Sequence, residues 1–221
     1  MKKVIVFFAL ILFGVAVLFY GCKKEEPLLP YLSELRENIF EGEDGGLKIK
    51  AAYGFNEYPK NFDGKTEKKR YVLSFTLFGA ETSAVEYSVG FNYGGTEYKS
   101  AFKYDPAEER LAADFFLDGF SAKSFPVTLS FASERREITL NSIIPEGTAN
   151  YVEILTALRE NQTAFIENLY VDGNFSAEII LRVIVKNGKA YYYVGIAREN
   201  YLKAFLMDGK TKEVLAIREI N

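Results

Sequence analysis

Alternation of apolar and polar residues between Leu47 and Ile144 is the feature that most constrains the fold of this 221-residue chain. A period of two places successive side chains on opposite faces of a β-strand, so that one face is buried and the other meets water. Turn residues separate the alternating segments, and Gly94-Gly95 fits a two-residue hairpin. The alternating segments are 47–55, 71–77, 85–93, 98–104, 111–117, 125–131 and 138–144. The pattern predicts a seven-stranded antiparallel β-sandwich over residues 46–145, with an immunoglobulin-like topology.

The break at Pro145–Gly147 ends this alternation, and a helical period follows it. Asn150 and Glu153 have the spacing of a capping box, in which two side chains cap backbone N–H groups at the start of a helix. Beyond them, apolar residues recur at helical spacing and form one stripe, made by Tyr151, Leu155, Leu158, Phe165, Ile166 and Leu169. We therefore expect a helix that begins near residue 150.

Four strands are predicted after the helix, at 176–186, 189–197, 201–207 and 213–220. Asn187-Gly188 and Asp208-Gly209 have the composition of hairpin turns between them. Together these elements predict a small α+β domain over residues 146–221, in which one helix covers a four-stranded antiparallel meander. The closing segment Tyr191–Glu219, with its stretch Met207–Leu215, resembles the closing hairpin of PepSY-type domains of secreted bacterial proteins.

A two-residue turn at Asn187-Gly188 also fixes the pairing of the strands on either side of it. It places Val183 opposite Tyr192 and Leu181 opposite Val194, and continues to Val185 with Ala190 and Ile179 with Ile196. These residues share one face of the sheet, and the face is uniformly apolar. We expect it to receive the apolar stripe of the helix.

The opposite face of this predicted sheet is left without a helix. It carries Ile180, Arg182, Ile184, Lys186, Tyr191 and Tyr193. Because soluble domains rarely expose a large apolar patch, we expect the sandwich, a second copy of the chain or an external protein to cover it. As a binding face it would use Tyr191 and Tyr193 as anchors, with Arg182 and Lys189 at its rim.

The N-terminal segment Met1–Cys22 has the pattern of a secretory signal, with two lysines, an apolar run over Val4–Tyr20 and a small residue. It ends on the chain's single cysteine. Gly21-Cys22 resembles the lipobox of bacterial lipoproteins, which implies that residues 1–21 are removed and that Cys22 carries a lipid. The alternative is an uncleaved anchor, since roughly 17–25 apolar residues span a bilayer. Both alternatives place the rest of the chain outside the cytoplasm, attached to the cell membrane.

Residues 22–45 are predicted to form the lipid tether and a short helix. Pro30 suits the first turn of a helix, and Leu32, Leu35 and Ile39 follow at spacings that share one helical face. The predicted helix spans Pro30–Phe40.

The composition excludes several chemistries. The chain has no histidine, which removes serine–histidine and cysteine–histidine catalysis and zinc sites built on imidazole. A lipidated Cys22 leaves no thiolate ligand and no disulfide within the chain. Lys and Arg number 27 against 30 Asp and Glu, and this acidic balance argues against a nucleic-acid partner, which would require a basic face.

These observations lead us to expect a lipid-anchored cell-envelope lipoprotein with no catalytic role and no cofactor or metal. Its expected partners are the membrane, held through the N-terminal lipid, and a protein or a second copy of the chain. A carboxylate-based hydrolase of cell-wall polymers is one alternative, because paired Asp and Glu residues cleave glycosides without histidine. A purely structural surface protein is the other.

Overall fold

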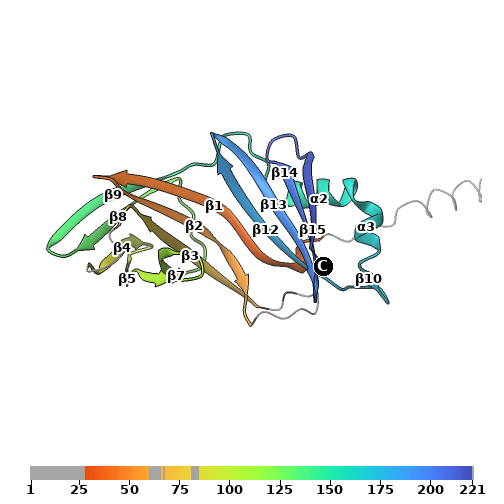
Figure 1. The fold of residues 1–221 in the computed structure, drawn as a ribbon, viewed down its shortest axis with the longest axis horizontal. Coiled ribbons are helices and arrows are strands. Elements are labelled where there is room, and N and C mark those ends of the chain that lie inside the picture. The colour runs from red at the N-terminus through yellow and green to blue at the C-terminus, as the bar shows by residue number, and fades with distance from the viewer. Residues whose placement is uncertain (1–27, 60–65, 67, 81–84, 221) are drawn as a thin grey trace, which may run out of the picture.

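The computed structural model describes residues 28–59, 66, 68–80 and 85–220, so the predicted signal and Cys22 lie outside the described residues. The protein is mainly β, as predicted, and is elongated, with strands at one end and helices packed on strands at the other (Figure 1). The first half contains η1 (Leu29–Tyr31), β1 (Leu32–Asp44), β2 (Leu47–Glu57), β3 (Lys69–Phe78), β4 (Tyr87–Tyr93), β5 (Thr96–Ala101), β6 (Lys103–Asp105), β7 (Arg110–Phe116), β8 (Ser124–Phe131) and β9 (Glu134–Ser142). The second contains α2 (Tyr151–Asn161), α3 (Thr163–Glu167), β10 (Tyr170–Val171), β11 (Asn174–Phe175), β12 (Glu178–Lys186), β13 (Lys189–Arg198), β14 (Tyr201–Asp208) and β15 (Val214–Ile220).

The strands predicted between residues 46 and 145 form two antiparallel layers around one core. One layer has the order β2-β3-β7-β6 and the other has the order β9-β8-β4-β5. With the strands lettered in chain order, these are the A-B-E-D and G-F-C layers of an immunoglobulin-like sandwich. The apolar residues that alternate along these strands, such as Ile49, Phe75, Val89 and Leu129, are buried between the layers.

The strand predicted at 98–104 passes from one layer to the other. Its first part, β5, pairs with β4, whereas its second part, β6, pairs with β7. Phe102 lies between the two parts, where its N–H donates to the Tyr87 carbonyl at 2.8 Å and its ring is buried in the sandwich core. The chain thus changes layers where one aromatic side chain turns inward.

The helix predicted over Pro30–Phe40 is wrong. Only the single 3₁₀ turn η1 precedes a long strand, β1, which runs from Leu32 to Asp44. Four consecutive residues from Leu32 to Leu35 are buried, because β1 has a neighbouring strand on each side and is covered on both faces. A bulge at Glu37 shifts the register between Arg36 and Asn38 and interrupts the alternation further.

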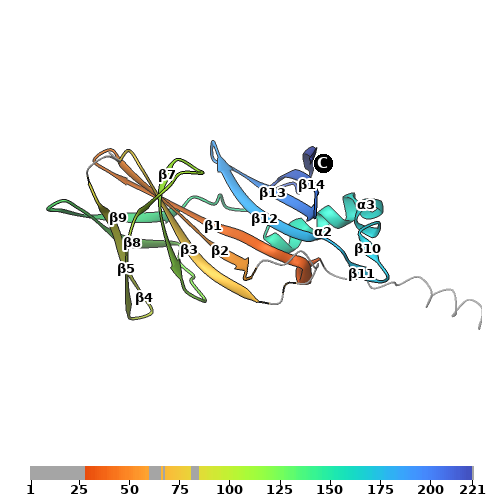
Figure 2. The same cartoon turned by 60° about the horizontal axis from the view of Figure 1, so that its bottom comes forward.

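β1 joins the two halves of the molecule. One of its edges pairs with β2 along Glu34–Asp44, and the other pairs with β9 at Phe40 and Glu41 and, in parallel, with β12 at 32–36. In the described part of the chain, thirteen strands therefore belong to one curled sheet that runs continuously from the sandwich to β15 (Figure 2). The division of the chain into domains at residue 145 stays a prediction. β1 contributes buried residues to both hydrophobic cores, the one under the helices and the one inside the sandwich.

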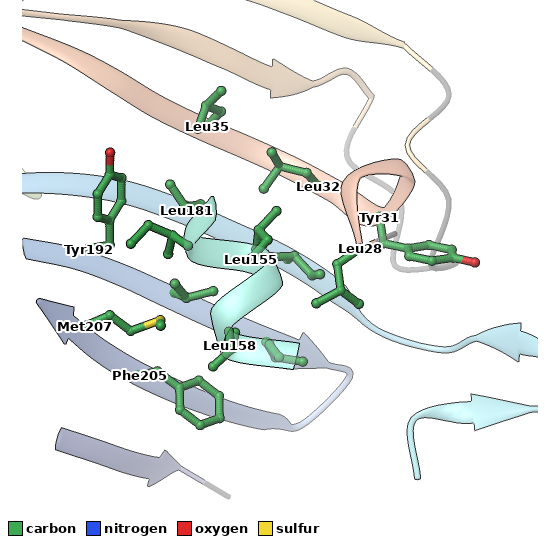
Figure 3. Packing of buried hydrophobic residues seen from close by; sticks show 14 of the residues in the cluster. Leu28, Tyr31, Leu32, Leu35, Leu155, Leu158, Leu181, Tyr192, Phe205 and Met207 are labelled. Carbon is green, nitrogen blue, oxygen red and sulfur yellow. The ribbon is translucent and has the colours of Figure 1, made fainter. Parts of the chain in front are cut away.

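The second half forms the predicted meander with a helix on one face. The capping box of α2 is present: the Asn150 side chain accepts from the N–H groups of Val152 and Glu153 at 3.0 and 3.1 Å, and the Glu153 carboxylate accepts from the Asn150 N–H at 2.9 Å. Leu155 and Leu158 of α2 lie against Leu181, Tyr192, Phe205 and Met207 of the sheet, and Leu32 and Leu35 of β1 complete the same core (Figure 3).

The pairing predicted from Asn187-Gly188 is confirmed along the whole hairpin. Val185 lies opposite Ala190, Val183 opposite Tyr192, and Leu181 opposite Val194. Except for the half-buried Val185, their side chains are in the core under α2. The Tyr192 hydroxyl donates to the Ala149 carbonyl at 2.6 Å at the edge of this core.

Candidate functional site

The face of β12–β15 that points away from α2 is the candidate site, and we call it the helix-free face. On it, Arg182 lies opposite Tyr193 and Ile184 lies opposite Tyr191, so that the predicted binding residues of the two strands are direct neighbours. Their partners along each strand, such as Leu181 and Tyr192, point into the core under the helix. Ile180, Arg182, Tyr191 and Tyr193 are half-buried, and Ile184 is 42% exposed.

A depression at the β12–β13 turn brings two of the predicted residues together. It has a volume of about 520 Å³ and is lined by Ile184, Lys186, Asn187, Lys189, Tyr191 and Leu206. Lys186 and Lys189 pair across the turn, so two ammonium groups stand at one end of an apolar surface. The local cause is the Asn187-Gly188 turn, whose residues both have positive φ and so let the two strands meet at a tight corner.

Arg182, which the sequence places at the rim of the binding face, is bound to Glu34 of β1. Its Nε and a terminal guanidinium nitrogen donate to the two carboxylate oxygens of Glu34 at 2.6 and 3.0 Å. Arg36 forms a second ion pair with Glu34 at 3.2 Å. The pKa of Arg182 is raised, first by its hydrogen bond to Glu34 and further by the charges of Glu34, Tyr193 and Glu108.

Tyr193 lies lengthwise against its own strand. A Cβ at Gly195 would stand 3.1 Å from both Cε1 and the hydroxyl of the Tyr193 ring, so the ring fills the space that the glycine leaves. The Tyr193 ring therefore packs on the backbone at Gly195, whereas Tyr191 lines the depression. The two tyrosines predicted as equivalent anchors have different surroundings.

The helix-free face continues over the last two strands. Leu206 lies opposite Tyr193, and Leu202 lies opposite Ile220, which is 45% exposed. The helix-free face is thus an apolar surface with Lys186 and Lys189 at one end. The ion pairs of Glu34 lie at its edge beside β1.

Sequence reasoning missed Glu34 and Arg36. Glu34 is 8% exposed, and it lies in a strand that the helical spacing of its neighbours concealed. The signal that would have revealed it is a charged residue inside an otherwise buried run, which requires a charged partner from elsewhere in the chain. That partner, Arg182, is 148 residues away.

Two features are absent from the described residues. Within 28–59, 66, 68–80 and 85–220, no group of three His, Cys, Asp or Glu side chains is arranged to hold a metal ion. No helix in the same ranges is long and apolar enough to cross a membrane. Cys22, the predicted lipidation site, lies outside the described residues. In comparisons with protein-family models, curated proteins and solved structures, nothing matches this chain.

Proposed function

We propose that this protein is a lipid-anchored, extracytoplasmic binding module without a catalytic role, and that its helix-free face takes a protein partner. The signal-like segment Met1–Cys22 supports the anchor through its apolar run and terminal cysteine. The helix-free face supports the binding role, because an apolar sheet surface without a covering layer is a common site of protein association.

The observation that carries the proposal is the depression between Ile184 and Tyr191. It combines an exposed aliphatic side chain, an aromatic ring with a polar end and two lysines within one small area. Tyrosine is favoured at interfaces because it buries a large area while losing little conformational freedom. The composition matches a protein surface site with an apolar centre and a charged rim.

The lysines also indicate the chemistry of the partner. Lys186 and Lys189 lie opposite each other, and the residues that line the depression include no acid, although Asp208 of β14 lies opposite Tyr191 and interacts with Lys189. An excess of one sign of charge at a rim raises the association rate for a segment of opposite charge. We therefore expect an acidic segment of the partner to lie over the β12–β13 turn, and apolar side chains to fill the depression beside Tyr191.

Site-specific photo-cross-linking in the native membrane tests the binding face. A photoreactive phenylalanine analogue at Ile184 should give a discrete adduct, and the same analogue at Val171 should not. Val171 is a suitable control because it is similarly exposed, at 47% against 42%, and lies on β10, away from the sheet. Lys189→Glu and Tyr191→Asp should each remove the adduct. Equal labelling at both positions, or none at Ile184, would refute a specific binding face.

The anchor has a separate test. Cys22→Ser should abolish labelling of the protein with a clickable palmitate analogue, because the thiol is the expected point of attachment. Continued labelling, or an intact mass that retains residues 1–21, would show that the protein is not a lipoprotein of this kind.

A further inference from the structure

A second surface feature lies at the junction of β2 and β3. It shares no residue with the depression at the β12–β13 turn. We call it the tether-side cluster; it comprises Tyr58, Lys68, Lys69, Arg70 and Phe116. The Arg70 guanidinium lies between two aromatic rings, 4.0 Å from the Tyr58 centroid and 4.4 Å from that of Phe116. The Lys69 ammonium lies 4.4 Å from the centre of the Phe55 ring.

The rings of this cluster are unusually exposed for large apolar side chains. Tyr58 and Phe116 are each 57% exposed, the highest values among the large hydrophobic residues that the structure describes. The Tyr58 N–H donates to the Lys68 carbonyl at 3.0 Å, which holds the end of β2 against the start of β3. The depression they line has a volume of about 450 Å³ and contains three basic residues against one acid, Asp118.

The cluster lies where the described chain begins. β1 starts at Leu32 beside the end of β2, and Glu57 at that end pairs with Lys69. The Thr66 N–H, between β2 and β3, donates to the Pro30 carbonyl of η1 at 3.3 Å. Leu28, the first described residue, belongs to the same buried cluster as the Phe55 ring that Lys69 covers.

The length of the tether places this end of the molecule near the membrane. Five residues lie between Cys22 and Leu28, and the six steps from one to the other reach at most about 21 Å at about 3.5 Å per residue. An anchor at or before Cys22 therefore holds the β2–β3 junction within a short distance of the lipid headgroups. The proximity is the same for a lipidated cysteine and for an uncleaved apolar anchor.

We propose that the tether-side cluster is a contact with anionic lipid headgroups, and that it orients the folded domain on the membrane. Guanidinium and ammonium groups pair with lipid phosphates. Exposed tyrosine and phenylalanine rings suit the boundary between headgroups and acyl chains. The Tyr58 and Phe116 rings fix the guanidinium between them, so the charged group and both rings face the surface as one unit. This proposal rests on the membrane anchor proposed above.

The absence of tryptophan from the chain provides a direct test. Tyr58→Trp adds a single fluorescent reporter to the cluster and preserves the stacking on Arg70. Tyr104→Trp is the matched control, because Tyr104 is 55% exposed and lies on β6, which pairs with the far end of β7. The full chain is purified from membranes in detergent and reconstituted in vesicles of zwitterionic lipid, with or without anionic phosphatidylglycerol brominated on its acyl chains.

We expect the Tyr58→Trp emission to shift to the blue and to be quenched by the brominated anionic lipid, whereas the Tyr104→Trp emission is unchanged. The double change Lys68→Glu and Arg70→Glu should abolish the quenching, as should high salt, whereas Lys103→Glu on β6 should leave it intact. Vesicle flotation separates the two proposals. A chain that floats with an unquenched Tyr58→Trp reporter refutes the headgroup contact alone, and a chain that does not float refutes the anchor on which the contact depends.

Discussion

Arg182 of β12 and Glu34 of β1 form a two-pronged ion pair, with nitrogen–oxygen distances of 2.6 and 3.0 Å, across the one parallel strand pair recorded among the described residues. Parallel pairs require a long connection, and here the connection is the whole sandwich together with both helices. The pair therefore joins the first described strand to the C-terminal strands of the same sheet.

The first prediction concerns this ion pair. Glu34→Gln removes the negative charge that Arg182 and Arg36 share and one of the two acceptor oxygens, and we expect a loss of about 2–3 kcal/mol in unfolding free energy. Arg182→Met should cost a similar amount, and the double variant should lose less than the sum of the two. Denaturant unfolding measures all three, and additive losses would show that the pair is not coupled. Glu219→Gln, which breaks the more exposed pair with Lys203, should cost below about 1 kcal/mol.

The second prediction concerns Glu37, the residue at the bulge of β1. Burial raises the pKa of its carboxyl above the ordinary value of 4.5. The folded protein thus keeps this proton at a pH where the unfolded chain has lost it, so the contribution to stability is complete below pH 4.5 and falls as the pH rises through the folded pKa. Glu37→Gln should raise the thermal midpoint at neutral pH and change it little in acid. Glu97→Gln removes the same charge at an exposed position, and its effect on the thermal midpoint should not differ between neutral pH and acid.

The third prediction concerns Tyr192, whose hydroxyl donates to the Ala149 carbonyl just before α2. Burial is the main cause that raises its pKa from 10.0 to about 12, with smaller contributions from the charges of Glu37 and Glu153. Stability should therefore fall as the pH rises from 10 to 12, because only the unfolded chain loses this proton readily. Tyr192→Phe should cost about 1 kcal/mol at pH 7 and should weaken the alkaline loss. An unchanged alkaline profile would contradict the assignment to Tyr192.

The fourth prediction concerns the coupling of the two cores. Leu158 of α2 is completely buried, and Leu158→Ala should cost about 2–5 kcal/mol. Because β1 lies in both cores, we expect this loss to appear as faster hydrogen exchange in β3 as well as in β13. Val152→Ala, on the exposed side of α2, is the control. Faster exchange confined to residues 148–221 would support independent domains that meet at residue 145.

Local signals in the sequence were sufficient for most of the fold. The hairpin at Asn187-Gly188, the capping box at Asn150 and the alternating strands of the sandwich each depend on residues close together in the chain, and each is confirmed. The immunoglobulin-like order followed from the number and spacing of the strands. The surface of the meander opposite α2 could be identified because strand pairing determines both faces at once.

The first strand could not be predicted for a physical reason. Leu32 and Leu35 are spaced as on a helix, but a register shift between Leu32 and Glu34 places both on the face under α2. Ile39 and its neighbour Phe40 are both buried, because β1 is covered on both faces there. Register shifts and burial on two faces remove the period of two that identifies a strand. The engagement of Arg182 by Glu34 was hidden for the same reason, because it required knowledge that β1 lies beside β12.

The placement of β1 also has a consequence for folding in the cell. The edge of β1 from Leu32 to Arg36 is synthesised before its partner in β12, which lies 148 residues further along the chain. At about 5–20 residues per second, the edge has no partner for roughly 7–30 s. During this interval it is an unpaired strand edge that other chains can pair with. We therefore expect the nascent protein to be most prone to aggregation before β12 has been synthesised.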